Sequence, residues 1–230
     1  MFDSNSITSF IHICDYTLLD KYTTQQEVID LCTKAKRLNV ASVCIPAEKV
    51  TLSKKELQQS SVLVCTVVSF PTGENSVEEK VIETTRAIQN GADEIDVVIN
   101  FKKIANESYL INELSTLVAL CHSNINKKGD PITIKVIIES GLHSIEETRF
   151  LTNLCIKTNV DYIKTSTGKV SVGAELDKVK TMFQEIQNEN SNLKIKASGG
   201  IRTIEDISQY LPYVNRLGMG YQSVDLLCGI

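Results

Sequence analysis

Short hydrophobic runs rich in β-branched residues recur along the whole chain, and most are followed by a longer segment with apolar residues three and four positions apart. The first pattern predicts buried β-strands, and the second predicts amphipathic helices. About eight strands are predicted, at residues 10–16, 39–45, 61–70, 93–100, 132–140, 160–166, 193–198 and 214–220. The predicted helices include residues 25–38, 76–90, 111–123, 144–158 and 175–190.

This alternation predicts a parallel sheet with helices outside it, because parallel neighbours need a crossover connection. About eight such units close naturally into a single-domain α/β fold, the (β/α)8 TIM barrel, here over residues 1–230. A doubly wound open sheet is the alternative. No linker rich in proline, serine or glycine interrupts the pattern, so we expect one domain. In a barrel the reactive side chains gather where the strands end.

Composition excludes several classes of protein. Hydrophobic residues make up 42% of the chain and charged residues 23%, which is typical of a globular protein. The net charge of -4 argues against a nucleic-acid partner, because such a partner normally requires a basic face. No apolar run approaches the roughly 18 residues of a membrane span, and residues 1–10 lack the basic cluster of a secretion signal. We therefore expect a cytoplasmic protein with no membrane partner.

Cysteine and histidine usage gives no sign of a metal. The seven cysteines include no C-x-x-C pair and several lie in apolar runs, which favours reduced packing residues. Of His12, His122 and His143, no two stand at ligand spacing. We expect neither a structural nor a catalytic zinc ion.

Three lysines lie inside late predicted strands, namely Lys135, Lys164 and Lys196. Burying an ammonium without a partner is costly, so each lysine either reaches solvent along the outside of the barrel or has an altered pKa. Amines that face one another inside a barrel would lower each other's pKa. Such an arrangement supplies a neutral lysine near neutral pH, which imine formation with a carbonyl substrate requires.

Asp96 occupies a comparable place in the predicted strand 93–100, with apolar residues on both sides. One interpretation is a structural ion pair with one of the lysines. The other is a proton shuttle, because imine chemistry moves protons on and off carbon and oxygen.

Two late segments carry groups that could bind phosphate. Residues 165–170 supply hydroxyls, the Gly168 amide and Lys169, while residues 198–203 supply Gly199, Gly200 and Arg202 before a helix expected to start at Thr203. Phosphate sites of TIM barrels often use the late loops. The alternative is that the glycines only permit tight turns. The segment is not a P-loop, because Val170 follows Lys169 where that motif has Ser or Thr.

Longer motifs resemble a known family over nearly the whole chain. They are CDYTLLD, ASVCIPAEKV, the block from Val64 to Asn100, KVIIESGL, DYIKTSTGK and KASGGIRT. Together they are similar to the deoxyribose-phosphate aldolases, which are class I (Schiff-base) aldolases with a TIM barrel. The resemblance implies that Lys164 forms the imine, that Lys196 tunes it and helps to move protons, and that Asp96 belongs to the proton relay.

The resemblance also implies the substrates and the residues that bind them. The family joins acetaldehyde reversibly to D-glyceraldehyde 3-phosphate, giving 2-deoxy-D-ribose 5-phosphate, without metal or other cofactor, and serves the breakdown of deoxyribonucleosides. A homodimer is expected. The implied substrate contacts are Gly168, Lys169, Gly199, Gly200, Arg202 and Gly218, together with Lys135 and Cys44.

The chain departs from the family pattern at two places, and two alternative functions stay open. Gly220 and Tyr221 stand where many relatives have paired hydroxyl residues, and Tyr16 replaces a histidine common in the first motif. One alternative is another phosphate-binding barrel enzyme, either a different Schiff-base aldolase or a sugar-phosphate isomerase. The other is a barrel that binds a sugar phosphate without turnover.

Overall fold

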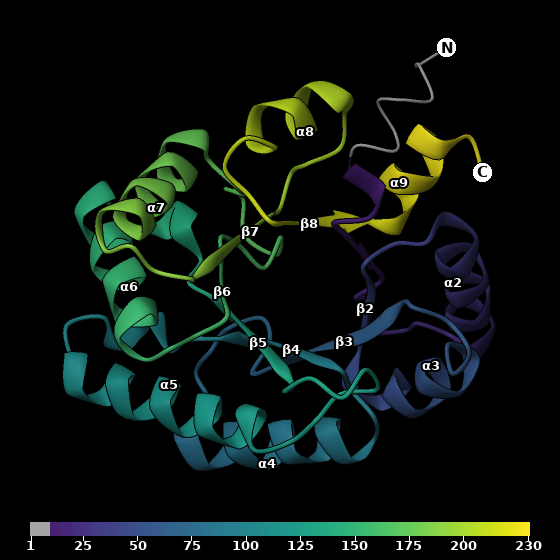
Figure 1. The fold of residues 1–230 in the computed structure, drawn as a ribbon, viewed down its shortest axis with the longest axis horizontal. Coiled ribbons are helices and arrows are strands. Elements are labelled where there is room, and N and C mark those ends of the chain that lie inside the picture. Colours follow the sequence, from purple (N-terminus) through teal and green to yellow (C-terminus); the bar gives the residue numbers. More distant parts are fainter. Residues whose placement is uncertain (1–9) are drawn as a thin grey trace.

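The computed structural model describes residues 10–230, in which parallel strands close into a barrel in sequence order (Figure 1). The barrel closes where β1 pairs with β8, Asp15 lying opposite Gly218. The strands are β1 (Cys14–Thr17), β2 (Ser42–Ile45), β3 (Leu63–Val68), β4 (Glu94–Val98), β5 (Thr133–Ile137), β6 (Tyr162–Lys164), β7 (Lys194–Ser198) and β8 (Arg216–Gly220). The predicted TIM barrel is confirmed, and the open sheet is excluded.

Helices surround the barrel on its outside (Figure 1). They are α2 (Gln25–Leu38), α3 (Val50–Glu56), α4 (Val77–Gln89), α5 (Glu107–His122), α6 (Ile145–Lys157), α7 (Leu176–Asn188), α8 (Ile204–Tyr210) and α9 (Tyr221–Cys228). The predicted helices match α2 and α4 to α7. The helices α3, α8 and α9 span only 7, 7 and 8 residues, too few for a clear apolar period.

The first predicted strand begins too early. Residues 10–11 are helical, and β1 starts only at Cys14. A short apolar run is compatible with a buried helix as well as with a strand, so periodicity could not separate the two. The first nine residues, where no secretion signal was expected, lie outside the described part of the chain.

Hydrogen-bonded caps fix where several helices begin. In each of four helices a Ser or Thr hydroxyl accepts the backbone N–H three residues later, while the acidic residue there accepts the N–H of the cap. The pairs are Thr24 with Glu27, Ser76 with Glu79, Ser144 with Glu147, and Thr203 with Asp206. These caps set the ends of the crossover connections and so the spacing of the strands.

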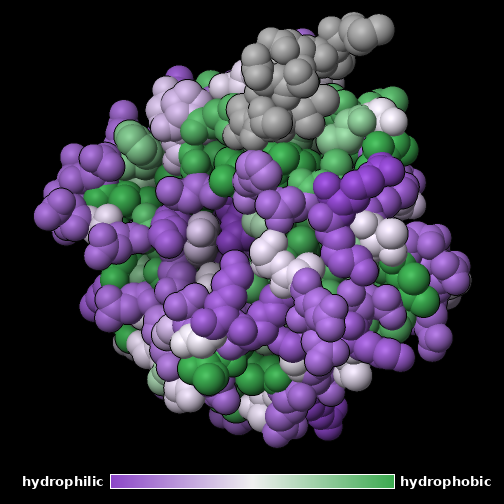
Figure 2. Space-filling view, turned by 45° about the vertical axis from the view of Figure 1, so that its right-hand side comes forward, coloured by the Kyte–Doolittle hydropathy of each residue, from purple (hydrophilic) through white to green (hydrophobic). Residues whose placement is uncertain are grey.

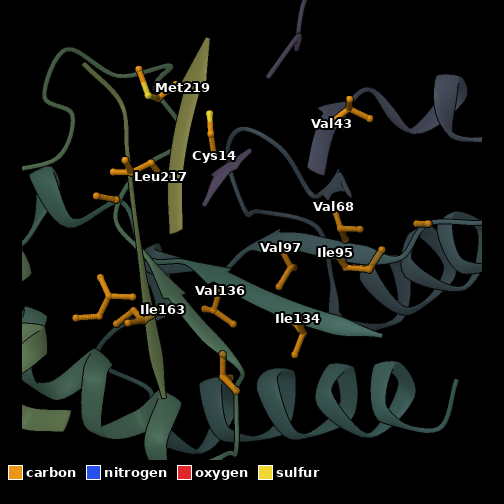
Figure 3. Packing of buried hydrophobic residues seen from close by; sticks show 14 of the residues in the cluster. Cys14, Val43, Val68, Ile95, Val97, Ile134, Val136, Ile163, Leu217 and Met219 are labelled. Carbon is orange, nitrogen blue, oxygen red and sulfur yellow. The ribbon is translucent and has the colours of Figure 1, made fainter. Parts of the chain in front are cut away.

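The main apolar core lies between the strands and the helices (Figure 3). Ile95 and Val97 of β4 lie beside Ile134 and Val136 of β5, and all four are at most 1% exposed. Burial of each such side chain stabilises the fold by roughly 1.5–3 kcal/mol. Because side chains alternate along a strand, the intervening residues, Asp96 among them, project into the barrel.

The outer surface is mostly polar on the face that Figure 2 shows, with hydrophobic groups in separate patches. Among residues 10–230, no helix is long and apolar enough to cross a membrane.

Candidate active site

The barrel interior is charged, although TIM barrels commonly fill it with branched apolar residues. The side chains concerned come from six strands and are Asp15, Glu94, Asp96, Lys135, Lys164, Lys196 and Arg216. Glu94 and Asp96 stand two residues apart on β4 and therefore share a face. Apart from Arg216, which is partly exposed, each of these residues is at most 4% exposed. Buried charges are tolerated when they are paired, and these are paired.

Asp96 lies at the centre of the three interior lysines. Its Oδ2 atom accepts hydrogen bonds from Lys164 Nζ and Lys196 Nζ, both at 2.7 Å. Its Oδ1 atom accepts one from Lys135 Nζ at 2.8 Å. A single carboxylate oxygen therefore bridges Lys164 and Lys196, which is the geometry required to pass a proton between two amines.

A second layer of charges lies beyond Asp96. Arg216 donates from Nη1 to Asp15 at 2.7 Å and from Nη2 to Glu94 at 2.9 Å. Lys135 Nζ lies 2.6 Å from Glu94 Oε2, and Lys196 forms an ion pair with Asp15. The network thus has three carboxylates and four cationic side chains. Every carboxylate contacts at least two cations.

The surrounding charges decide the protonation of this network. Burial by itself would lower the pKa of Lys196, but the carboxylates of Asp15 and Asp96 outweigh it and raise that pKa above its ordinary value. Lys135 behaves in the same way, since Asp96 lies beside it. Burial would raise the pKa of Asp96, yet the three lysines hold it well below its ordinary value. Lys135 does lower the pKa of Lys196, as predicted, but the carboxylates outweigh this effect, so neither Lys135 nor Lys196 has the lowered pKa that a neutral amine would need.

Two groups of side chains in this interior have atoms of the kind that can bind a metal ion, all within 4.8 Å of one another. One group is Cys44, Cys65 and Asp96, and the other is Asp15, Cys65 and Glu94. Cys65 belongs to both groups, and its Sγ atom lies 3.3 Å from Lys135 Nζ. The same ammonium contacts Asp96 and Glu94. The lysine thus supplies the positive charge that a metal ion would bring to these atoms.

A cavity of about 370 Å³ opens above Lys164 at the carboxyl ends of the strands. Six of the residues predicted to bind substrate line it: Gly168, Lys169, Gly199, Gly200, Arg202 and Gly218. Lys164 lines it as well and is 4% exposed. Asp96 lies beneath, in contact with the Lys164 amine, and Lys196 contacts the same oxygen of Asp96.

Lys135 and Cys44 do not line this cavity, contrary to the prediction from the family resemblance. Both are fully buried. Lys135 lies on the far side of Asp96 from Lys164, held by Glu94 and Asp96. The structure therefore places Lys135 in the charge network, paired with Glu94 and Asp96.

The loops after β6 and β7 pack against each other through glycines. A Cβ atom on Gly173 would lie 2.2 Å from the carbonyl oxygen of Gly199, so no other residue fits there without a shift of the backbone. Gly168 and Gly199 have φ values of +73° and +86°, which L-residues rarely adopt. These glycines are needed for the shape of the loops that form the cavity.

Glu139 fixes the loop after β6 from below. Its buried carboxylate accepts hydrogen bonds from Thr167 N at 3.2 Å and Thr167 Oγ1 at 2.5 Å. Glu139 itself has a φ of +52°, which is unusual for a residue with a side chain. The sequence reasoning missed it, although an acidic residue at the end of the predicted strand 132–140 was a visible signal.

A helix N-terminus without a side-chain cap faces the cavity at α9, whereas α8, which was expected here, begins behind a capping box at Thr203. Asp206 already accepts from Arg202 N at 2.9 Å and Thr203 N at 3.0 Å. The cap of α9 is Gly220, which makes no side-chain hydrogen bond to the helix. Amides of this kind and the helix dipole favour an anion.

Other cavity residues were missed by the sequence analysis. They are Thr17 of β1, Ser198 of β7, and Gln222 and Ser223 of α9. Asp15, which pairs with Lys196, gave the same signal in the sequence as the lysines did, because it is a charged residue in an apolar run. Thr17 follows Asp15 by two residues and therefore lies on the same face of the strand. Ser223 gave no signal, because its position depends on α9 beginning at Tyr221.

The cavity has a lysine amine at its floor and several anion-binding groups around its rim, and a carboxylate below bridges this amine to a second lysine. A barrel enzyme with this arrangement is suited to imine chemistry on an anionic carbonyl compound. Comparison with known proteins identifies the family. A family model described as DeoC/LacD family aldolase matches residues 10–213. The chain therefore belongs to the DeoC/LacD family of aldolases, which are carbon–carbon lyases.

Individual relatives agree with the family match. The deoxyribose-phosphate aldolase of Mycoplasmoides pirum is 39% identical over 198 residues, 86% of each chain. That of Treponema denticola is 37% identical over 221 residues, 94% of each chain. A crystal structure from Coccidioides immitis has a TM-score of 0.88 at 30% identity and covers 96% of this chain, which covers 87% of that one.

Proposed function

We propose that the chain cleaves 2-deoxy-D-ribose 5-phosphate reversibly into acetaldehyde and D-glyceraldehyde 3-phosphate. Two relatives named for this activity match 97% and 94% of the chain. The observation that carries the proposal is the contact of Lys164 and Lys196 with one oxygen of Asp96, at 2.7 Å each, beneath a cavity with anion-binding groups.

The proposed chemistry begins with attack of the neutral Lys164 amine on the aldehyde carbon of the open-chain sugar. The carbinolamine then loses its hydroxyl group, which takes up one proton and leaves as water, so that a protonated imine remains. Loss of the proton from the C3 hydroxyl then breaks the bond between C2 and C3, so that D-glyceraldehyde 3-phosphate leaves and an enamine remains on Lys164. Protonation of the enamine carbon and hydrolysis of the resulting imine release acetaldehyde and restore the amine.

Asp96 and Lys196 are proposed to manage these protons. The raised pKa of Lys196 keeps its ammonium charged, so it can stabilise Asp96 as a carboxylate beside the reacting amine. The Lys164 amine is the one that reaches the cavity.

The phosphate is proposed to bind at the rim, far from the reacting carbon. Gly200 and the start of α9 offer backbone amides there, and Arg202 and Lys169 offer positive charge. Lys169 Nζ donates to the Leu19 carbonyl at 3.1 Å, which holds this charge at the edge of the cavity.

The activity is tested by measuring release of acetaldehyde from 2-deoxy-D-ribose 5-phosphate by the wild-type chain and by Lys164→Arg. We expect turnover by the wild type and none by the variant, because a guanidinium does not form an imine. Lys157→Arg, at an exposed residue of α6, is the matched control and should keep full activity. Binding of the substrate without turnover by the wild type would instead support a sugar-phosphate binding protein.

A homodimer and a cytoplasmic location stay predictions from the sequence. The Aeropyrum pernix relative, with a TM-score of 0.84 at 23% identity, is described as tetrameric. Size-exclusion chromatography with light scattering would measure the mass of the particle that this chain forms.

A further inference from the structure

The helix α9 is weakly attached to the barrel by packing, although its first turn lines the cavity. Val224 is its only fully buried residue, while Leu226 is 81% exposed. A second, smaller cavity of about 140 Å³ lies next to α9, between Tyr16 of β1, Lys34 of α2 and Tyr221. Tyr221, Leu227 and Cys228 also pack against the core but are only partly buried, so polar contacts add to the packing that positions this helix.

Those contacts converge on Asp225 in the middle of α9. Its carboxylate accepts a hydrogen bond from the hydroxyl of Tyr16, and its other oxygen lies 2.5 Å from Lys34 Nζ. Tyr16 is fully buried, so its hydroxyl has no access to bulk water and needs this partner. Three elements, β1, α2 and α9, are thus tied together at one carboxylate.

Tyr16 also contacts the first residue of α9. Its ring meets the ring of Tyr221 edge to face, with centroids 6.5 Å apart and planes at 84°. Tyr221 begins the helix, and Gln222 and Ser223, which follow, line the cavity. Asp225 lies one turn further on, so fixing it fixes the direction of the free amides in the first turn.

We propose that the contact of Tyr16 and Lys34 with Asp225 positions the first turn of α9 and thereby sets the affinity of the cavity for the phosphate group of the substrate. The identity of the substrate in this inference rests on the proposed function, whereas the effect on phosphate affinity does not. Tyr16, Lys34 and Asp225 are positioning residues, because none of them lines the 370 Å³ cavity.

Tyr16→Phe is the sharpest test, because it removes one hydroxyl and keeps the ring that packs on Tyr221. We expect the KM for 2-deoxy-D-ribose 5-phosphate to rise roughly two- to fivefold, the range that a helix N-terminus contributes to binding an anion. The rate of imine formation with acetaldehyde, which has no phosphate, should not change. Tyr22→Phe, at a residue that is 81% exposed, is the matched control and should alter neither value.

Two results would overturn the proposal. One is an equal loss with both compounds, which would show a general structural role for Tyr16. The other is an unchanged KM in Tyr16→Phe. If that variant does not fold, Lys34→Met removes the other half of the contact from a side chain that is 37% exposed, with the same expected direction.

Binding of inorganic phosphate separates this inference from the proposed function. Titration calorimetry should give a dissociation constant that rises in Tyr16→Phe by the same factor as the KM, and hydrogen exchange at residues 221–224 should become faster. If the wild type lacks aldolase activity but the phosphate affinity still falls in Tyr16→Phe, the proposed function fails and the positioning role stands. An unchanged phosphate affinity contradicts the positioning role whatever the activity.

Discussion

Asp96 accepts hydrogen bonds from three lysine side chains, and this sharing distinguishes it from an ordinary structural ion-pair residue. Lys164 and Lys196 donate to the same oxygen, and Lys135 donates to the other. The three ammonium groups hold the pKa of Asp96 well below its ordinary value although burial opposes this. The carboxylate is therefore ionised at neutral pH, and one of its oxygens accepts hydrogen bonds from both Lys164 and Lys196.

Replacement of Asp96 by Asn should lower turnover by about a hundredfold or more, because general acid–base catalysis contributes on that scale. Asn keeps the shape of the side chain but carries no negative charge, and its NH2 group would face an ammonium donor where Asp96 has an acceptor oxygen. The measurement is kcat for cleavage of 2-deoxy-D-ribose 5-phosphate, with circular dichroism as the check on folding. Asp130→Asn, at an exposed residue, is the control. Wild-type turnover in Asp96→Asn would exclude Asp96 from the proton relay.

At the scale of elements, the cavity depends on two loops that touch through backbone atoms. The loop after β6 is held by Glu139 through Thr167, and the loop after β7 meets it at Gly173 and Gly199. Ala174 N also donates to Gly199 O at 3.0 Å. The groups on both loops that are proposed to bind phosphate are therefore held in place by the contact between the loops.

Gly173→Ala should disturb both loops, because its Cβ atom would lie 2.2 Å from the Gly199 carbonyl oxygen. Forcing a methyl group into a packed site typically costs about 1–3 kcal/mol, and we expect a lower urea midpoint together with a raised KM. Ser171→Ala, at an exposed residue of the same loop that does not line the cavity, is the matched control. Equal effects of the two substitutions would show that the contact between the loops is unimportant.

At the scale of the whole molecule, closure of the barrel brings distant parts of the sequence into one charge network. Asp15 and Arg216, which pair at 2.7 Å, are 201 residues apart. Breaking a buried pair of this kind leaves an uncompensated charge, so the network requires the whole barrel to close. The active site and the fold are in this sense formed together.

The sequence located the three lysines and Asp96 because charges in apolar runs are visible, and strand alternation places each on one face of its strand. It could not give their depth, since the stagger of strands in a barrel decides which layer a side chain joins. Lys135 was expected at the cavity from the family resemblance, and its burial beside Asp96 depends on the assembled barrel. The protonation of Lys196 was missed because Asp15 contacts it only after β1 joins β8. Ser223 and the free end of α9 likewise depend on tertiary structure.

His143 should make the stability of the fold depend on pH. Its side chain is 6% exposed, Glu147 and Lys178 lie near it, and burial lowers the pKa of the imidazole below its ordinary value of 6.5. The unfolded chain therefore binds a proton more readily than the folded chain. This contribution to stability is fully present above pH 6.5 and is lost as the pH falls from there through the lower pKa of the folded state.

The check is the urea midpoint measured between about pH 7.5 and about pH 5.5, for the wild type and for His143→Gln, which cannot titrate. The wild type should lose more stability than the variant as the pH falls. Parallel curves for the two proteins would show that His143 does not contribute to the pH dependence.

The most direct measurement is mass spectrometry of the chain after incubation with acetaldehyde followed by borohydride, which reduces an imine to a stable ethyl adduct. Peptide mapping then locates the adduct. We predict one ethyl group, on Lys164, with Lys135 and Lys196 unmodified because both remain protonated and fully buried. An unmodified Lys164, or an adduct on another lysine under conditions that label a known aldolase of the family, would contradict the assignment of Lys164 as the imine-forming residue.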